Sequence, residues 1–270
     1  MGPEQAYHQS PLRLVTYDRR GRRRLGAFLG GEVVDLPDLV GHPAFPTTLE
    51  ALVSSSGGTV LDAARAALER DEAERFVVPN ARVLAPLYPA SLRSTDAFEG
   101  GRQVLGPDDE IPWPEDAAWL DYEPKIVAVL GHRELDPDDP GPAVLGYTLL
   151  SDWTARAATG DPAETAEGVP IAIGPSVVST DEIDPQAVYL SVRVDGVEWA
   201  KGNLNGAATN LFRMISVIAR RDRVAAGDAF ALGPFGVFGT NPGRQLWPGA
   251  TVTLDADGIG TLRNRIGHRP

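Results

Sequence analysis

The sequence contains no cysteine and no long uninterrupted run of apolar residues. The absence of cysteine excludes disulfide bonds, thiolate metal ligands and a cysteine nucleophile. No stretch approaches the roughly 18 consecutive apolar residues of a transmembrane helix, and the first residues lack the apolar segment of a signal peptide. We therefore expect a cytoplasmic protein without a membrane-spanning segment.

Basic residues are also scarce relative to acidic ones. The formal net charge is −12, with 25 Lys and Arg against 37 Asp and Glu, and such a surface repels the phosphates of nucleic acids. One basic run, "RRGRRRLG" at 19–26, lies between two segments of alternating apolar residues. We interpret it as a solvated hairpin turn, so the charge balance argues against a nucleic-acid partner.

Glycine and proline, by contrast, are abundant, with 29 and 23 residues in a chain of 270. This composition favours a turn-rich β protein over a helical bundle. Alternating apolar residues over 12–36 predict a three-stranded meander, with turns at "DRRGRR" and "GGE". Apolar residues at helical spacing predict helices over 47–53, 59–76 and 210–222.

A proline-punctuated stretch, "VVPNARVLAPLYPASLR", indicates a linker near residue 85. We therefore predict a mainly β, α+β protein with a small β-plus-helix domain over 1–84 and a larger β-rich domain over 85–270. Periodicity alone does not determine how the strands of the larger domain close.

Common catalytic motifs are missing as well. The four histidines have no metal-ligand spacing, and the chain contains no GxSxG, no Walker loop and no strand-linked GxGxxG. We interpret His132, which follows an apolar run, as a surface turn residue. Candidate chemistry therefore rests on acidic groups beside apolar segments.

In the segment "WLDYEPKIVAVLG" at 119–131, a carboxylate at Glu123 and an ammonium at Lys125 stand at the start of an apolar run. Side chains two residues apart in a strand point to the same face, so both charges enter a buried sheet together. Another carboxylate, Asp152, follows the apolar segment "GYTLLS". Because a lone buried charge is costly, these carboxylates need a partner, either a divalent metal or an ammonium.

Five segments carry a family pattern in the same order along the chain: "GPDDEIPWPEDAAWLDYEPKIVAVLG", "GYTLLSDWTAR", "IGPSVVSTDEIDP", "VRVDGVEWAKGN" and "WPGATVTLDADGIGTLRNRI". Together they resemble the fumarylacetoacetate hydrolase superfamily. The resemblance implies a mixed β-roll after a small leading domain, usually as a homodimer. It also implies chemistry on small 2-oxo and 1,3-dicarbonyl acids, with Mg²⁺, Mn²⁺ or Ca²⁺ held by a Glu-x-Glu pair and an Asp.

Several positions depart from the family pattern. The Glu-x-Glu pair has become Glu123-Pro124-Lys125, whereas Asp152 stands at the Asp ligand. In the lid segment "LRSTDAFEGGR", Glu99 matches the pattern, but Gly101 stands at the catalytic His. The loop "ETAEGVPIAIGP" lacks the family's active-site lysine, and "LGPFGVFG" replaces the Thr-Gly-Thr-type substrate loop. These changes together remove the usual metal-assisted hydrolysis.

Three hypotheses follow from this comparison. The first is an enzyme of specialised metabolism that works without metal on an enolisable β-dicarbonyl or polyketide-like small molecule, by cyclisation, isomerisation, dehydration or decarboxylation. The second is a metal-dependent acylpyruvate-type C–C hydrolase or decarboxylase, with Mg²⁺ or Mn²⁺ held weakly by Glu123 and Asp152. The third is a non-catalytic small-molecule-binding protein of the same fold.

The first hypothesis needs no cofactor, because the Lys125 ammonium takes the place of the missing metal. Its candidate residues are Glu99, Lys125, Glu123 and Asp96 for acid–base catalysis, and Arg102, Arg156, Trp153 and Phe235 for substrate binding.

Overall fold

The structure is a computed structural model that describes residues 11–55, 58–94, 102–157, 165–166, 169–205, 209–233 and 245–269. Within these residues the strands form one sheet of twelve strands and one of five. The larger sheet contains β1 (Arg13–Asp18), β2 (Arg23–Leu29), β3 (Glu32–Asp35), β4 (Val77–Val78), β5 (Val83–Leu84), β6 (Leu92–Arg93), β7 (Val104–Leu105), β9 (Ala117–Leu130), β10 (Val144–Ala157), β11 (Thr165–Ala166), β12 (Ile171–Ser179) and β15 (Ala229–Leu232). The smaller sheet contains β8 (Glu110–Ile111), β13 (Leu190–Val194), β14 (Val197–Gly202), β16 (Thr251–Ala256) and β17 (Gly260–Ile266).

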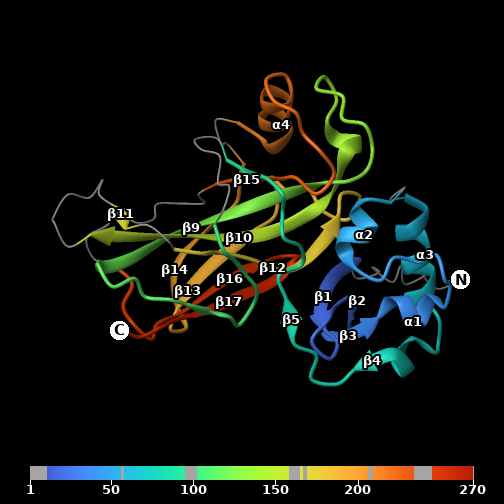
Figure 1. Cartoon of the computed structure of the whole chain (residues 1–270), viewed down its shortest axis with the longest axis horizontal. Helices are drawn as coiled ribbons and strands as arrows, with labels where there is room; N and C mark the ends of the chain where they lie inside the picture. Colours follow the sequence, from blue (N-terminus) through green and yellow to red (C-terminus); the bar gives the residue numbers. More distant parts are fainter. Residues whose placement is uncertain are drawn as a thin grey trace, which may run out of the picture.

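The helices are short and lie outside the sheets. They are α1 (Leu36–Val40), α2 (Leu49–Val53), α3 (Gly58–Leu68), η1 (Ala73–Phe76), η2 (Gly141–Ala143) and α4 (Leu211–Ala219). Helices α1, α2 and α3 gather with β1, β2 and β3 at one end of the molecule, whereas α4 lies beyond β15 (Figure 1).

The predicted meander over 12–36 is confirmed, because β1, β2 and β3 pair in antiparallel order. Its first strand also pairs with β12, where Leu14 lies opposite Val177. The large sheet therefore runs without interruption from the N-terminal strands into the rest of the chain. The division into domains at residue 84 stays a prediction.

The two long strands β9 and β10 form the centre of the larger sheet and pair along most of their length. Most pairs of strands are antiparallel, but β7–β12, β6–β15 and β8–β17 are parallel. Apolar side chains of β9 and β10 pack against those of β13, β16 and β17 in one shared core. The predicted mainly β, α+β class with mixed sheets is thus confirmed. The two sheets of the larger predicted domain face each other and bury this core between them.

Local sequence signals account for several element boundaries. Helix α1 is capped at its N-terminus by Asp35, whose side chain accepts from the Asp38 backbone N–H, and at its C-terminus by Gly41, whose φ of 69° suits glycine. The helix predicted over 59–76 is divided, because α3 ends at Leu68 and a separate 3-10 turn follows. That turn buries Ala73, which a continuous helix would place elsewhere.

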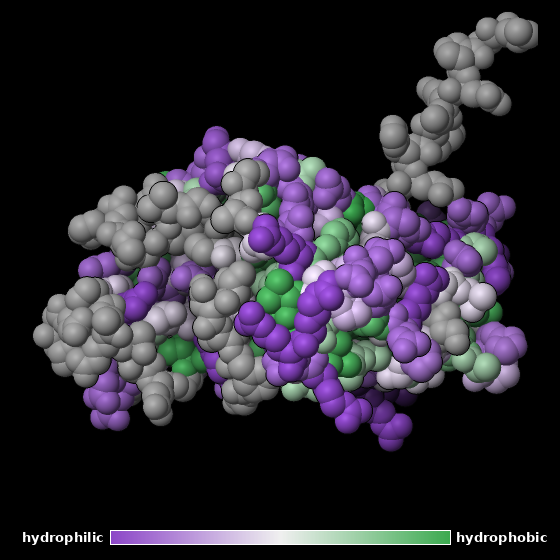
Figure 2. Space-filling view, turned by 90° about the horizontal axis from the view of Figure 1, so that it is seen from above, coloured by the Kyte–Doolittle hydropathy of each residue, from purple (hydrophilic) through white to green (hydrophobic). Residues whose placement is uncertain are grey.

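On the face drawn in Figure 2, hydrophilic residues (purple) predominate and apolar residues (green) are scattered among them. The exposed large apolar side chains are Tyr88, Tyr189, Val197, Phe212, Val217 and Trp247. Across the described ranges, no helix is long and apolar enough to cross a membrane. The homodimer stays a prediction.

Candidate functional site

The predicted ionic residues meet where β9 and β10 pair. Glu123 lies directly opposite Asp152, and Lys125 lies opposite Leu150. The apolar neighbours Val127 and Leu150 belong to the core on the outer face of the large sheet, away from the five-stranded sheet. Because strand side chains alternate, Glu123, Lys125 and Asp152 share that outer face.

The Lys125 ammonium lies between the two carboxylates. Its Nζ is 2.5 Å from Oδ2 of Asp152 and 3.2 Å from Oε2 of Glu123. The side chains of Lys125 and Asp152 are 7% and 8% exposed, whereas that of Glu123 is 45% exposed. The cluster therefore has a buried ion pair at its base and one carboxylate open to solvent.

A second cation, the Arg102 guanidinium, binds the other carboxylate oxygen of Asp152. The Arg102 guanidinium donates from Nη1 to Oδ1 of Asp152 at 2.5 Å. It also donates to the backbone carbonyls of Trp153 at 2.6 Å, Val169 at 3.0 Å and Pro170 at 3.2 Å. A direct contact between Arg102 and substrate stays a prediction.

These two cations keep Asp152 ionised. Burial by itself raises the pKa of Asp152, but the charges and hydrogen bonds of Lys125 and Arg102 outweigh it and lower the pKa below its ordinary value. The carboxylate is therefore an anion at neutral pH and can hold the ammonium in place.

Glycine is needed beside the lysine. Gly233 directly follows β15, which pairs with β9 through Leu232 and Ile126. A Cβ at this position would lie 2.6 Å from the Pro124 carbonyl oxygen and 2.7 Å from Cγ of Lys125. Any larger residue would displace the lysine or the strand.

The other predicted residues separate into two groups. Arg156 lies on β10 and reaches Asp121 on β9, with 3.4 Å between Nη2 and Oδ2. Trp153 points into the core between the sheets, is 1% exposed, and packs on Tyr122 with 5.5 Å between ring centroids. A contact between its ring and a ligand at Asp152 would have to cross the sheet.

Three predicted residues, Asp96, Glu99 and Phe235, lie outside the described residues, as does most of the lid segment. Their roles stay predictions.

The cluster does not fit a divalent metal. Such an ion needs several converging oxygen ligands, whereas an ammonium offers donors and no acceptor. Here Lys125 stands between Glu123 and Asp152, and Arg102 takes the remaining oxygen of Asp152. In the part of the chain that the structure describes, no three His, Asp or Glu side chains are grouped as a metal site requires.

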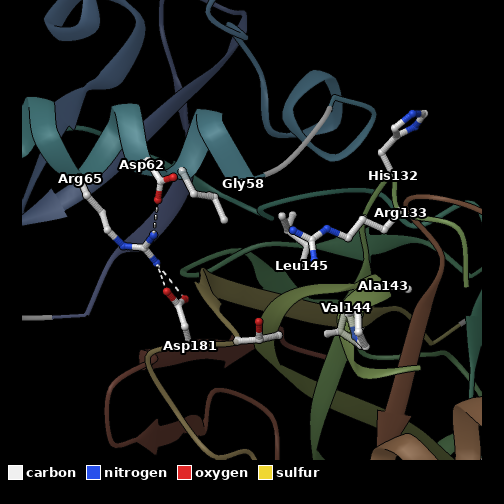
Figure 3. A pocket seen from close by; sticks show the side chains of 13 residues that line it. Gly58, Asp62, Arg65, His132, Arg133, Ala143, Val144, Leu145 and Asp181 are labelled. Carbon is white, nitrogen blue, oxygen red and sulfur yellow. Dashed lines mark hydrogen bonds and ion pairs between the residues drawn. The ribbon is translucent and has the colours of Figure 1, made fainter. Parts of the chain in front are cut away.

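A separate cavity of about 210 Å³ lies at the far end of β9, between α3 and the start of β10 (Figure 3). Arg65 lines it and pairs with Asp62 on the same helix and with Asp181 beyond the helix, with nitrogen–oxygen distances of 3.4 and 2.8 Å. His132 lines it from an exposed turn, in agreement with its interpretation as a surface residue. The positive charge of Arg65 is matched by carboxylates, and its ion pairs with Asp181 and Glu182 join α3 to the segment that follows β12.

Comparison with known proteins identifies the scaffold. The family profile described as fumarylacetoacetate (FAA) hydrolase C-terminal matches residues 89–267. The chain belongs to the fumarylacetoacetate hydrolase family. The 2,4-didehydro-3-deoxy-L-rhamnonate hydrolase of Sphingomonas sp. is 25% identical over 283 aligned positions, which cover 94% of this chain and 96% of that protein.

Two further relatives of this family bear on its chemistry. The oxaloacetate tautomerase YisK of Bacillus subtilis is 29% identical over 174 positions, covering 61% of this chain and 58% of the tautomerase. The structure of maleylpyruvate hydrolase from Sphingobium sp. SYK-6 in complex with manganese(II) ion and pyruvate has a TM-score of 0.74 at 20% identity. It covers 96% of this chain and 100% of that one, and it shows the same fold. Relatives in the family therefore include hydrolases and a tautomerase.

Sequence reasoning missed two features of the site. Gly233 was seen only as part of a substrate loop, and Arg102 only as a possible anion clamp. Nothing in the local sequence signals that Arg102 meets Asp152, because fifty residues separate them and the contact needs the folded sheet.

Proposed function

We propose that this protein is an enzyme that moves protons at the keto–enol group of a small molecule without using a metal ion. The substrate is an enolisable β-dicarbonyl or polyketide-like compound of specialised metabolism, and the overall step is a cyclisation, isomerisation, dehydration or decarboxylation. The observation that carries the proposal is the buried Lys125 ammonium, 2.5 Å from Asp152 and 3.2 Å from Glu123. The family resemblance implies a metal at these positions.

In this proposal Glu123 acts as the base and Lys125 as the electrophile. The exposed carboxylate of Glu123 takes a proton from the carbon beside the carbonyl. The electron pair of that C–H bond forms the C=C bond of the enolate, and the π pair of the C=O bond moves onto the oxygen. The fixed ammonium of Lys125 stabilises the negative charge that develops there. Return of the proton from Glu123 to oxygen or to another carbon completes an isomerisation. In a cyclisation the enolate carbon attacks a second carbonyl carbon, whose oxygen takes the proton, and in a dehydration the enolate expels hydroxide, which takes the proton and leaves as water. In a decarboxylation the C–C bond to the carboxylate breaks in place of the C–H bond, CO₂ leaves, and Lys125 stabilises the same enolate; none of these steps needs an oxidant or reductant.

The remaining predicted residues complete the proposed site. Asp152 holds the ammonium and does not touch the substrate. Further acid–base groups and substrate contacts are Asp96, Glu99, Arg156 and Phe235. Trp153 lies on the opposite face of the sheet, so any effect of it on substrate binding would be through packing of the core.

The relatives support this class of reaction. A tautomerase interconverts keto and enol forms, which is the proton transfer proposed here, and the tautomerase YisK is 29% identical to this chain. Oxaloacetate, the compound in the name of that tautomerase, is a small oxo acid. The chemistry of a tautomerase needs stabilisation of an enolate, and an ammonium in a dry site can provide it.

The test uses the scarcity of lysine, because Lys125 and Lys201 are the two lysines of the sequence. The protein is incubated in D₂O with acetylacetone, pyruvate or oxaloacetate, and exchange of the acidic C–H is followed by ¹H NMR. We expect catalysed exchange that survives EDTA, is lost in Lys125→Met and is kept in Lys201→Met. Lys201 is a suitable control because its side chain is 56% exposed and pairs with Glu198.

Two results would contradict the proposal. One is stoichiometric Mg²⁺ or Mn²⁺ in the purified protein together with loss of exchange on chelation. The other is a folded Lys125→Met protein with full exchange activity.

The metal-dependent acylpyruvate-type hydrolase or decarboxylase is the second candidate. The solved relative that holds manganese(II) and pyruvate is the observation that favours it. For an ion to bind at Glu123 and Asp152, the Lys125 ammonium would have to leave its position between them. Metal analysis after purification separates it from the first candidate. A non-catalytic binder would show thermal stabilisation by ligand, about 2.7 kcal/mol at a hundred times Kd, without any C–H exchange.

A further inference from the structure

We infer that Arg102 is a positioning residue that holds Asp152, and through it the Lys125 ammonium, in the geometry that the reaction needs. The inference rests on the proposed function for its kinetic part and on geometry alone for its structural part. It gives Arg102 a role other than a substrate clamp.

The guanidinium of Arg102 joins three parts of the chain. It donates to Asp152 Oδ1 and to the carbonyl of Trp153 on β10, and also to the carbonyls of Val169 and Pro170 just before β12. Its side chain is 25% exposed. A planar group with five N–H donors in a fixed arrangement can satisfy these four acceptors together.

The backbone carbonyls set the position of the guanidinium, and the guanidinium sets the rotation of the carboxylate. A carbonyl within a paired strand cannot move unless the strand moves, so Arg102 is fixed relative to β10. Its contact with Oδ1 directs Oδ2 of Asp152 toward Lys125, at 2.5 Å. Without Arg102 the carboxylate could turn and offer both oxygens to the ammonium.

Arg102 also changes the charge that Lys125 presents. Asp152 is shared by two cations, so its negative charge neutralises neither of them completely. The ammonium therefore keeps more attraction for a developing enolate than it would beside a carboxylate of its own. The position and the charge of the Lys125 ammonium both affect the rate of the chemical step. Neither effect requires Arg102 to touch the substrate.

This role predicts a distinct kinetic signature. In Arg102→Gln, kcat should fall about 100-fold, as expected when a reacting group is displaced by an ångström, while KM changes little. A substrate clamp would instead raise KM and leave kcat nearly unchanged. Arg102→Lys should resemble Arg102→Gln, because an ammonium has three donors without the planar arrangement.

The matched control is Arg65→Gln. Arg65 is also 25% exposed and also bridges several partners, Ser179, Asp181 and Glu182, but at the cavity of Figure 3. It should lose stability with unchanged kcat and KM. If Arg102→Gln does not fold, Arg102→Lys is measured in its place.

A second measurement does not depend on activity. With ¹⁵N-lysine labelling, the ammonium groups of Lys125 and Lys201 are observed separately by NMR. We expect the Lys125 protons to exchange with solvent about tenfold faster in Arg102→Gln than in the parent protein, because the pair opens more often. They should be unchanged in Arg65→Gln.

An unchanged Lys125 signal in Arg102→Gln, or a rise in KM alone, would overturn the inference. If the parent protein exchanges no C–H of any compound tested, the proposed function fails, and the ammonium signal still decides whether Arg102 positions Lys125.

Discussion

Two buried aspartates, Asp35 and Asp152, both contact two cations and both have a pKa below the ordinary value, but they belong to different environments. At each, burial raises the pKa and the bound cations and hydrogen bonds outweigh it. Asp35 caps helix α1 and accepts from Tyr17 and Arg24, so every contact joins the N-terminal elements to one another. Asp152 instead holds a buried lysine beside an exposed carboxylate.

The two clusters differ in how deeply their cations are buried. Arg19 and Arg24, the partners of Asp35, are 46% and 19% exposed, so water solvates part of their charge. Lys125 is 7% exposed, and burying a compact ammonium is costly even when it is paired. Stability alone accounts for the Asp35 cluster, whereas the Asp152 cluster fits a function that needs a dry positive charge.

The largest expected difference between the clusters comes from removing one cation from each. Lys125→Met should lower the free energy of unfolding by about 3–5 kcal/mol, because the buried Asp152 carboxylate loses the more buried of its two cations and the apolar methionine cannot replace that hydrogen bond. Arg24→Met should cost about 1–2 kcal/mol, because Asp35 keeps Tyr17, Arg19 and the Asp38 N–H. Urea unfolding of both variants measures this, and equal costs would remove the distinction.

A smaller effect should follow from crowding the lysine without removing its charge. Gly233→Ala places a methyl group against Lys125 Cγ and the Pro124 carbonyl, and should cost about 1–3 kcal/mol. Gly202→Ala is the control, because no atom lies within 4 Å of the added carbon and its φ is not in the left-handed region. Thermal unfolding should separate the two; a neutral Gly233→Ala would mean that Lys125 has room to move.

Acid should also distinguish the clusters. A carboxylate with a lowered folded-state pKa contributes stability above its unfolded pKa, near 3.9, and that stability is lost as the pH falls through the folded pKa. In Lys125→Met the pKa of Asp152 should rise, so acidification should remove its contribution to stability at a less acidic pH. Each unit by which the pKa rises lowers the free energy of unfolding at neutral pH by about 1.4 kcal/mol. Arg24→Met should shift the acid transition less, as circular dichroism between pH 2 and 7 would show.

The smallest effect is expected at Tyr17. Burial and the hydrogen bond to Asp35 raise the pKa of Tyr17 above its ordinary value, so the phenol stays a donor at all working pH values. Tyr17→Phe removes one of several contacts to Asp35 and should cost about 1 kcal/mol. If Tyr17→Phe lowered the free energy of unfolding as much as Lys125→Met does, the Asp35 cluster would depend on each contact as strongly as the Asp152 cluster.

Periodicity in the sequence was enough to predict the meander over 12–36, the helix α4 and the placement of Glu123 and Lys125 on one face. These features depend on side-chain alternation within a few residues, which the local pattern specifies. The division of the 59–76 segment was not predicted, because the apolar spacing continues past Leu68, where α3 ends, into the separate 3-10 turn that buries Ala73.

The sequence by itself determined the β-rich class, the family pattern and the two charges that enter β9, since each depends on the order of residues along the chain. The tertiary structure alone decided that β1 joins β12, that Gly233 packs on Lys125 and that Arg102 meets Asp152. These contacts join residues far apart in the chain, and their geometry follows from how the sheets pair and pack, which no local pattern encodes.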